Sequence, residues 1–239
     1  MSIFENAPRS ARAYAKTDVM LMGIDSVSLR SIMENHAETA VLLLHQMLKV
    51  STNRLQNTNN FVADIVRWGD EARERAIRDK VTGIYNRRYY DEVIHEEFQA
   101  AQNNGKPLSI VMVDLDRFRE INDIHGHQAG DSVIKKAARI FQLALRETDI
   151  LVRYGGDEFA FLMPTTDLEE AFNITERIRQ IIAGSEILFD SSKPALRISV
   201  SIGIAGYPQN STNLIELCRM ADQALYRAKE NGRNKVICF

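Results

Sequence analysis

Hydrophobic residues follow two different spacings along the chain, and the change falls near residue 79. From His36 to about Arg78 they recur at heptad spacing without a proline, which predicts one long helix. After residue 79, short apolar runs typical of strands alternate with amphipathic stretches typical of helices. We therefore predict three parts: a short mixed fragment at residues 1–35, a long helix at residues 36–78, and an α/β domain at residues 79–239.

The predicted long helix carries two rows of residues with heptad spacing, most of them apolar. One row holds Val41, Leu48, Leu55, Val62, Gly69 and Ala76, and the companion row holds Leu44, Ser51, Thr58, Ile65 and Ala72. Such rows are typical of a parallel dimeric coiled coil. Ser51, Thr58 and Gly69 weaken the seam, so a helix that packs on its own domain is the alternative.

Four apolar or alternating runs predict the strands of the α/β domain. Residues 108–115 form a near-continuous apolar run, which predicts a buried central strand. Strands at 150–153 and 158–163 flank Gly155-Gly156, a hairpin signal. Residues 197–205 alternate strictly, which predicts a strand buried on one face. Amphipathic helices at 129–145, 167–183 and 214–230 and a last strand at 235–239 complete an α/β sandwich on one sheet.

Composition narrows the classes of protein that the chain can belong to. The formal net charge of −2 gives no general attraction to nucleic acid or to a membrane surface. No apolar run approaches the roughly 20 residues that a membrane span needs, and no secretory signal is visible at the amino terminus. Cys218 and Cys238 are too few for a disulfide framework. We expect a cytoplasmic protein that binds neither nucleic acid nor membrane.

Acidic residues stand at two places where strands end. Asp114 and Asp116 lie where the buried strand finishes, and Asp157 and Glu158 follow the Gly-Gly turn. Carboxylates at a strand end and a hairpin tip can converge, and such oxygen ligands hold Mg²⁺ together with substrate phosphates. In the alternative interpretation, Asp114 caps the following helix and Asp157-Glu158 is only a polar turn.

Four ordered segments resemble the GGDEF family of diguanylate cyclases. They are DKVTGIYNRR at 79–88, DLDRFREINDIHGHQAGD at 114–131, RYGGDEF at 153–159 and KENGRN at 229–234. Val81 and Arg119 stand where the family usually has leucine and lysine. The resemblance implies a central, mostly antiparallel sheet flanked by helices. It also implies an enzyme that condenses two GTP into cyclic di-GMP and two pyrophosphates, with Mg²⁺ or Mn²⁺ as cofactor.

The resemblance assigns the catalytic and metal-binding roles to residues at the two acidic places. Glu158 would help to deprotonate the attacking 3′-hydroxyl, and Gly155 and Gly156 would let the backbone approach the nucleotide. The metal ligands would be Asp114, the carbonyl of Leu115, Asp157 and Glu158.

The resemblance also assigns substrate contacts. Backbone N–H groups of Phe118 and Arg119 would bind phosphates, and Asn122 and Asp131 would select guanine. Lys229 and Arg233, four residues apart at a helix end, would share one face and clamp the phosphates. The alternative for this pair is an exposed basic helix end favoured by the helix dipole. Because each domain binds one GTP, the reaction requires two chains that face each other, and a symmetric homodimer is the simplest arrangement.

A second ligand site is implied upstream of the Gly-Gly turn. Arg146-Glu147-Thr148-Asp149 resembles the family's R-x-x-D site for inhibitory product, which Arg177 would complete. The alternative is an exposed ion pair between Arg146 and Asp149. A catalytically silent module that senses GTP or cyclic di-GMP through this site is the rival to an active enzyme. The intact acidic residues argue against that rival.

The first residues show a weaker resemblance. Residues 2–11 are similar to the later half of the phosphate-binding cassette of cyclic-nucleotide-binding domains, with Arg9 at the position that holds the phosphate. Alternation at Val19, Leu21 and Gly23 predicts strand, and residues 26–35 predict a short helix capped by Asp25 or Ser26. The family's first strands and its Gly-Glu are missing. We therefore expect a truncated or decayed domain that does not bind cyclic nucleotides.

Overall fold

The computed structural model describes residues 12–187 and 195–239, and the chain divides into two compact units, Met1–Asp70 and Glu71–Phe239. In the first unit, helix α2 (Ser26–Asn35) forms as predicted, and the carboxylate of Asp25 caps it by accepting from Val27 N and Ser28 N. Residues 12–25 contain no strand. The strand prediction was wrong there, because no strand within residues 12–187 and 195–239 pairs with this short alternation. Arg9 and its cassette lie outside the described residues.

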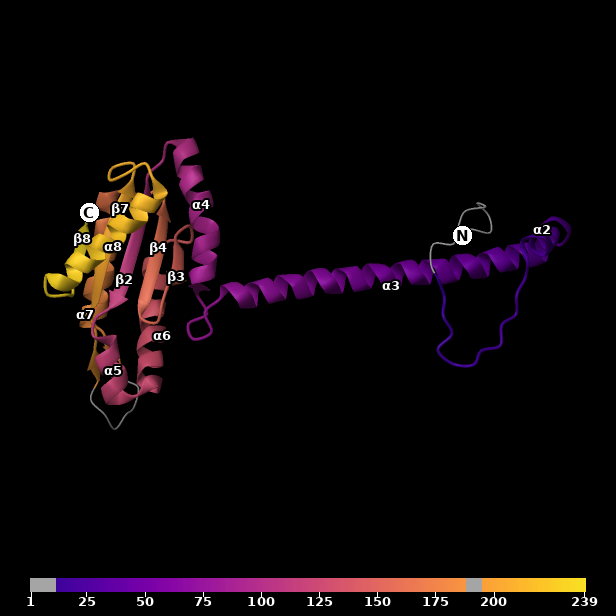
Figure 1. The fold of residues 1–239 in the computed structure, drawn as a ribbon, viewed down its shortest axis with the longest axis horizontal. Coiled ribbons are helices and arrows are strands. Elements are labelled where there is room, and N and C mark those ends of the chain that lie inside the picture. The colour runs from indigo at the N-terminus through magenta and orange to yellow at the C-terminus, as the bar shows by residue number, and fades with distance from the viewer. Residues whose placement is uncertain (1–11, 188–194) are drawn as a thin grey trace. The chain divides into compact units, whose positions relative to one another are not determined.

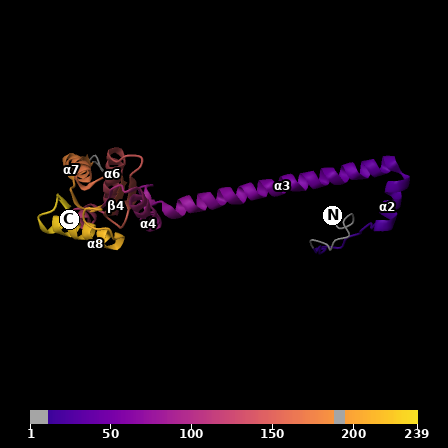
Figure 2. The ribbon, with the colours of Figure 1, turned by 90° about the horizontal axis from the view of Figure 1, so that it is seen from above.

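Helix α3 (Ala37–Ile77) confirms the predicted long helix, and Figure 2 shows it without a break. Apolar side chains of both predicted rows are exposed on it, among them Val41, Leu44, Leu48, Leu55, Val62 and Ile65. No helix among the described residues has an apolar stretch long enough to cross a bilayer.

The second unit is built on a six-stranded sheet in the order β1-β3-β4-β2-β7-β8 (Figure 1). The strands are β1 (Tyr85–Asn86), β2 (Leu108–Leu115), β3 (Ile150–Arg153), β4 (Glu158–Pro164), β7 (Val200–Tyr207) and β8 (Val236–Cys238). The three inner pairings are antiparallel, and the two outer pairings are parallel. A separate two-stranded sheet pairs β5 (Glu186–Ile187) with β6 (Leu196–Arg197). The expected α/β architecture with a mostly antiparallel sheet is confirmed.

Helices cover both faces of the sheet. Helices α4 (Arg87–Asn104) and α8 (Leu214–Glu230) share one buried apolar cluster with the sheet, and α6 (His127–Ala144) and α7 (Leu168–Gly184) share the other. A further short helix, α5 (Phe118–His125), directly precedes α6. The hydrophobic pattern did not predict α5. Gly126, at φ 83°, separates the two helices.

Strand β7 corrects the prediction of a half-buried strand, because both of its faces are covered. Ser201 on the supposedly polar face is fully buried. A Cβ atom at Gly203 would lie 2.1 Å from the backbone nitrogen of Leu225 in α8. Small residues on this face therefore mark the close approach of a helix, not solvent.

Candidate active site

Asp114 and Glu158 are paired positions on neighbouring antiparallel strands. Asp114 lies near the end of β2, and its partner in the register is Glu158, the first residue of β4. The backbone N–H of Leu115 donates to the carbonyl of Asp157 at 3.1 Å. The strand-end acid and the hairpin-tip acids thus lie side by side because the β2–β4 register aligns them.

The Asp114 carboxylate is buried and paired with a lysine. Only 8% of the residue is exposed, and its Oδ2 atom lies 2.6 Å from Nζ of Lys229. Burial raises the pKa of Asp114 to about 6; the nearby Asp157 and Glu158 add to the rise, and Lys229 opposes it. The alternative that Asp114 caps a helix is wrong, because α5 begins at Phe118 without a side-chain cap.

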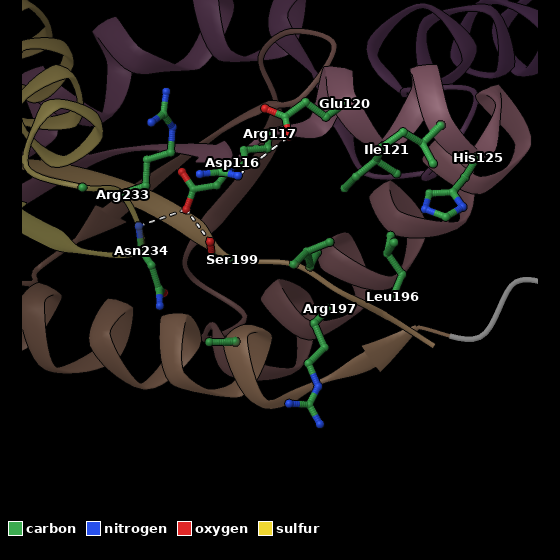
Figure 3. Close-up of a pocket in the computed structure, with 14 residues that line it drawn as sticks. Asp116, Arg117, Glu120, Ile121, His125, Leu196, Arg197, Ser199, Arg233 and Asn234 are labelled. Carbon is green, nitrogen blue, oxygen red and sulfur yellow. Dashed lines mark hydrogen bonds and ion pairs between the residues drawn. The ribbon is translucent and has the colours of Figure 1, made fainter. Parts of the chain in front are cut away.

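Asp116 has a different role from its neighbour. Its carboxylate accepts from the hydroxyl of Ser199 at 2.6 Å and from the backbone N–H of Asn234 at 3.0 Å (Figure 3). It also accepts from the hydroxyl of Ser201 at 2.7 Å. These bonds tie the end of β2 to β7 and to the loop after α8. The buried charge of Asp116 is satisfied internally, so this residue supports the site and is not a free ligand.

The first glycine of the hairpin makes room for Glu158. A Cβ atom at Gly155 would lie 2.7 Å from Oε2 of Glu158, whereas one at Gly156 would meet nothing within 4 Å. The carbonyl of Glu158 accepts from the N–H groups of Tyr154 and Gly155, at 2.8 and 3.1 Å. The two glycines therefore differ: a side chain at Gly155 would displace the carboxylate of Glu158, whereas one at Gly156 would point into open space.

The start of α5 offers uncapped backbone donors. Arg117 precedes the helix in the left-handed conformation, at φ 57°, and no side chain caps the first N–H groups, which include those of Phe118 and Arg119. Helix N-termini of this kind attract phosphate oxygens.

On the next turn, the amide of Asn122 packs over Gly130, where a Cβ atom would lie 2.0 Å from its Oδ1. Asp131, the next residue along α6, is exposed.

Lys229 and Arg233 do not share a helix face, so that prediction was wrong. Helix α8 ends at Glu230, and Arg233 follows Gly232 in the left-handed conformation, at φ 61°. Lys229 lines an open pocket of about 370 Å³ together with Tyr154 and Glu158. Arg233 instead lines a pocket of about 600 Å³ between α5 and the loop after α8, whose wall includes Asp116, Arg117, Glu120 and Asn234 (Figure 3).

The R-x-x-D segment is a turn, not a helix. The guanidinium of Arg146 contacts Glu170 of α7, and Arg146 N donates to Oδ2 of Asp149 at 2.9 Å. The alternative of an ion pair between Arg146 and Asp149 side chains is therefore wrong. Burial raises the pKa of Asp149, and its Oδ1 is buried without a hydrogen-bond partner among the described residues. Arg177 of α7 donates to the carbonyl of Ala144, the last residue of α6, at 3.3 Å. No local pattern or family motif pointed to Glu170.

Comparisons with known proteins identify the family of the chain. The family model described as "Diguanylate cyclase, GGDEF domain" matches residues 76–235. The response regulator PleD of Caulobacter vibrioides is 36% identical over 70% of the chain and 37% of its own length. Diguanylate cyclase A of Treponema denticola is 31% identical over 80% of the chain and 52% of its own length. The chain thus spans about half or less of the length of these curated relatives.

In two similar solved structures the match covers most of the other chain's length. The coiled coil and GGDEF domain of DgcB from Caulobacter crescentus, in complex with c-di-GMP, has a TM-score of 0.73 at 28% identity; the match covers 78% of this chain and 97% of that one. Diguanylate cyclase SiaD from Pseudomonas aeruginosa, in complex with its activator SiaC, has a TM-score of 0.65 at 28% identity, covering 90% of this chain and 81% of that one. The chain therefore belongs to the GGDEF-domain family of diguanylate cyclases.

Proposed function

We propose that this protein is an active diguanylate cyclase that converts two GTP into cyclic di-GMP and two pyrophosphates. In each of two equivalent steps, the 3′-oxygen of one nucleotide bonds to the α-phosphorus of the other, and the bond from that phosphorus to pyrophosphate breaks. The observation that carries the proposal is the pairing of Asp114 with Glu158 across β2 and β4, beside Lys229.

Enzymes of this family typically use divalent metal ions. Among the described residues, no group of three or more His, Cys, Asp and Glu side chains forms a self-sufficient metal site. The acids at the end of β2 nevertheless suit Mg²⁺ or Mn²⁺, because Mg²⁺ needs only one or two carboxylates when substrate phosphates complete its shell. We assign this role to Asp114 and Asp157, with Glu158 and the Leu115 carbonyl beside them. A bound ion would stabilise negative charge that develops on the phosphates.

We assign the remaining roles to the residues that match the motifs of the family. Glu158 accepts the proton of the attacking 3′-hydroxyl. The uncapped N–H groups of Phe118 and Arg119 hold phosphate oxygens, as do the side chains of Lys229 and Arg233. Asn122 and Asp131 bind the guanine edge, since an amide and a carboxylate accept from its N–H donors.

Two chains are needed, because one domain holds one GTP. The exposed apolar rows of α3 support a parallel pairing of two copies through this helix, and the similar DgcB structure includes a coiled coil. We place the reaction in the cytoplasm, in keeping with two cysteines, Cys218 and Cys238, that form no disulfide.

We assign product inhibition to Arg146, Asp149 and Arg177. The partnerless buried oxygen of Asp149 supports this assignment, because a buried acceptor without a donor is costly and guanine N–H groups supply donors. DgcB has been crystallised with c-di-GMP. If this site alone binds ligand, the protein is a sensor and not an enzyme.

The test is incubation of purified protein with GTP and Mg²⁺, with detection of cyclic di-GMP. The wild type is expected to form product with a rate per chain that rises with protein concentration, and Glu158→Gln is expected to bind GTP without turnover. GTP or cyclic di-GMP binding without product from the wild type would instead establish the silent sensor.

A further inference from the structure

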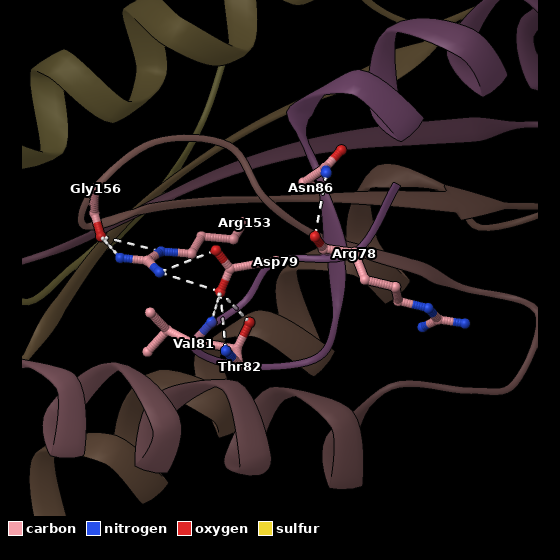
Figure 4. A network of polar contacts seen from close by, with 7 residues as sticks. All are labelled: Arg78, Asp79, Val81, Thr82, Asn86, Arg153 and Gly156. Atoms are coloured by element: carbon pink, nitrogen blue, oxygen red, sulfur yellow. Dashed lines mark hydrogen bonds and ion pairs between the residues drawn. The ribbon is translucent and has the colours of Figure 1, made fainter. Parts of the chain in front are cut away.

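A single arginine joins the signature loop to the segment that follows α3. Arg153 is the last residue of β3, and its side chain is 14% exposed. Its Nη1 donates to both carboxylate oxygens of Asp79 at 3.1 Å. Its Nε and Nη2 donate to the carbonyl of Gly156 at 3.2 and 2.7 Å (Figure 4). One guanidinium therefore connects the chain two residues beyond α3 to the loop that carries Asp157 and Glu158.

Asp79 is itself rigidly held. Its carboxylate accepts from Val81 N at 3.2 Å and from Thr82 N and Oγ1 at 2.9 and 2.7 Å (Figure 4). Burial opposes ionisation of Asp79, but the hydrogen bonds from Thr82 and the charge of Arg153 outweigh it and lower its pKa. Asp79 is therefore a charged, fixed anchor for Arg153.

The end of α3 is bonded to the same turn. Asn86 Nδ2 donates to the carbonyls of Ala76 and Arg78 at 2.8 and 3.3 Å, while its Oδ1 accepts from Tyr89 N at the start of α4. The guanidinium of Arg78 stacks 4.1 Å from the ring centre of Tyr85. A displacement of the last turn of α3 must therefore move the turn that contains Asp79.

We propose that Arg153 is a positioning residue that sets the signature loop according to where the end of α3 holds Asp79. A guanidinium suits this role because it is planar, and its donors point in fixed directions to both partners at once. A shift of Asp79 moves Arg153 and therefore changes the position of the Gly156 carbonyl. Through the next peptide units it also changes the positions of the carboxylates of Asp157 and Glu158. The consequence for catalysis rests on the proposed function; the coupling of the loop to α3 does not.

The test compares Arg153→Lys, Arg153→Gln and Asp79→Asn in the full chain. Hydrogen exchange of the amides at 154–158 is expected to rise about tenfold or more, while β2 and β7 keep wild-type protection. Arg153→Lys is expected to resemble Arg153→Gln, because an ammonium cannot make both paired contacts. Turnover at saturating GTP falls at least fivefold, and GTP affinity changes less than twofold.

Two further variants sharpen the comparison. Glu176→Gln removes an ion pair of similar burial, with Arg179, in the same unit, and is expected to leave exchange at 154–158 unchanged. The double variant Asp79→Asn/Arg153→Lys is expected to show no faster exchange at 154–158 and no lower turnover than either single variant. Both changes break the same link between Asp79 and Arg153, so their effects should not add. The proposal would be overturned if the Arg153 and Asp79 variants had a lower unfolding midpoint but wild-type exchange at 154–158. The ion pair would then stabilise the fold without positioning the loop. Absence of cyclic di-GMP from the wild type would refute the enzyme, not this coupling.

Discussion

The Nζ atom of Lys229 lies 2.6 Å from Oδ2 of Asp114, so a residue expected to bind phosphate holds a residue expected to bind metal. The carboxylate is 11% exposed and the lysine 32%. Asp157 and Glu158 add negative charge around Asp114. Lys229 therefore neutralises an acidic cluster at the end of β2, and substrate phosphates would compete for the same ammonium group.

Removal of this lysine should destabilise the fold in a pH-dependent way. We expect Lys229→Met to lower the free energy of unfolding by about 1–2 kcal/mol at neutral pH, less than the loss for a fully buried pair because the lysine is partly solvated. The loss should shrink at about pH 5, where Asp114 is protonated. Urea unfolding measures it. Arg219→Met, an exposed change on the same helix, is the control; equal losses in both variants at both pH values would contradict the pairing.

Protonation of Asp114 should control cation binding. Its pKa is raised from 3.8 to about 6 in the folded chain, so a divalent cation must displace a proton below that pH. Cation affinity is then expected to fall about tenfold per pH unit below about 6 and to level off above it. As pH rises, the unfolded chain loses the Asp114 proton near pH 3.8, whereas the folded chain keeps it up to about pH 6. The contribution of Asp114 to stability therefore falls as pH rises from 3.8 to about 6.

Calorimetric titration with Mn²⁺ between about pH 5 and pH 8 checks the cation prediction. Asp114→Asn removes the ionisable carboxyl, so its residual binding should be weak and should lose the step near pH 6. A wild-type affinity that is flat across this range would show that Asp114 does not ligate the ion.

Gly155 and Gly156 should respond differently to the same methyl group. In Gly155→Ala the new Cβ would meet Oε2 of Glu158 at 2.7 Å, whereas in Gly156→Ala it meets nothing within 4 Å. The flexible Glu158 side chain can move aside, so we expect Gly155→Ala to fold normally and lose about tenfold or more in turnover, with GTP affinity nearly unchanged. If Gly156 instead admits the nucleotide, Gly156→Ala should weaken GTP binding. Steady-state kinetics with separate kcat and KM values distinguish the two.

Local pattern and family motifs predicted most of the elements but not their contacts. The run at 108–115 and the hairpin at Gly155-Gly156 were visible because a buried strand and a tight turn have short-range signatures. The contact between Lys229 and Asp114 depends on how α8 packs over the sheet, which no local spacing encodes. Arg233 was misplaced because Gly232 lets the chain leave the helix before it. The small residues of β7 resembled a polar face, although they accommodate a helix backbone.

Glu170 should compete with product for Arg146. The two side chains are in contact and half-exposed, so a ligand that binds Arg146 must first displace Glu170. We expect Glu170→Gln to tighten cyclic di-GMP binding about two- to fivefold, the range of an exposed ion pair. Asp149→Asn should weaken binding about tenfold or more, because the buried Oδ1 atom without a hydrogen-bond partner would be the acceptor for guanine in the proposed site. Calorimetric titration with cyclic di-GMP measures both, and the exposed neighbour Glu169→Gln is the control. Weaker binding in Glu170→Gln would mean that Glu170 orients Arg146 for the ligand and does not compete with it.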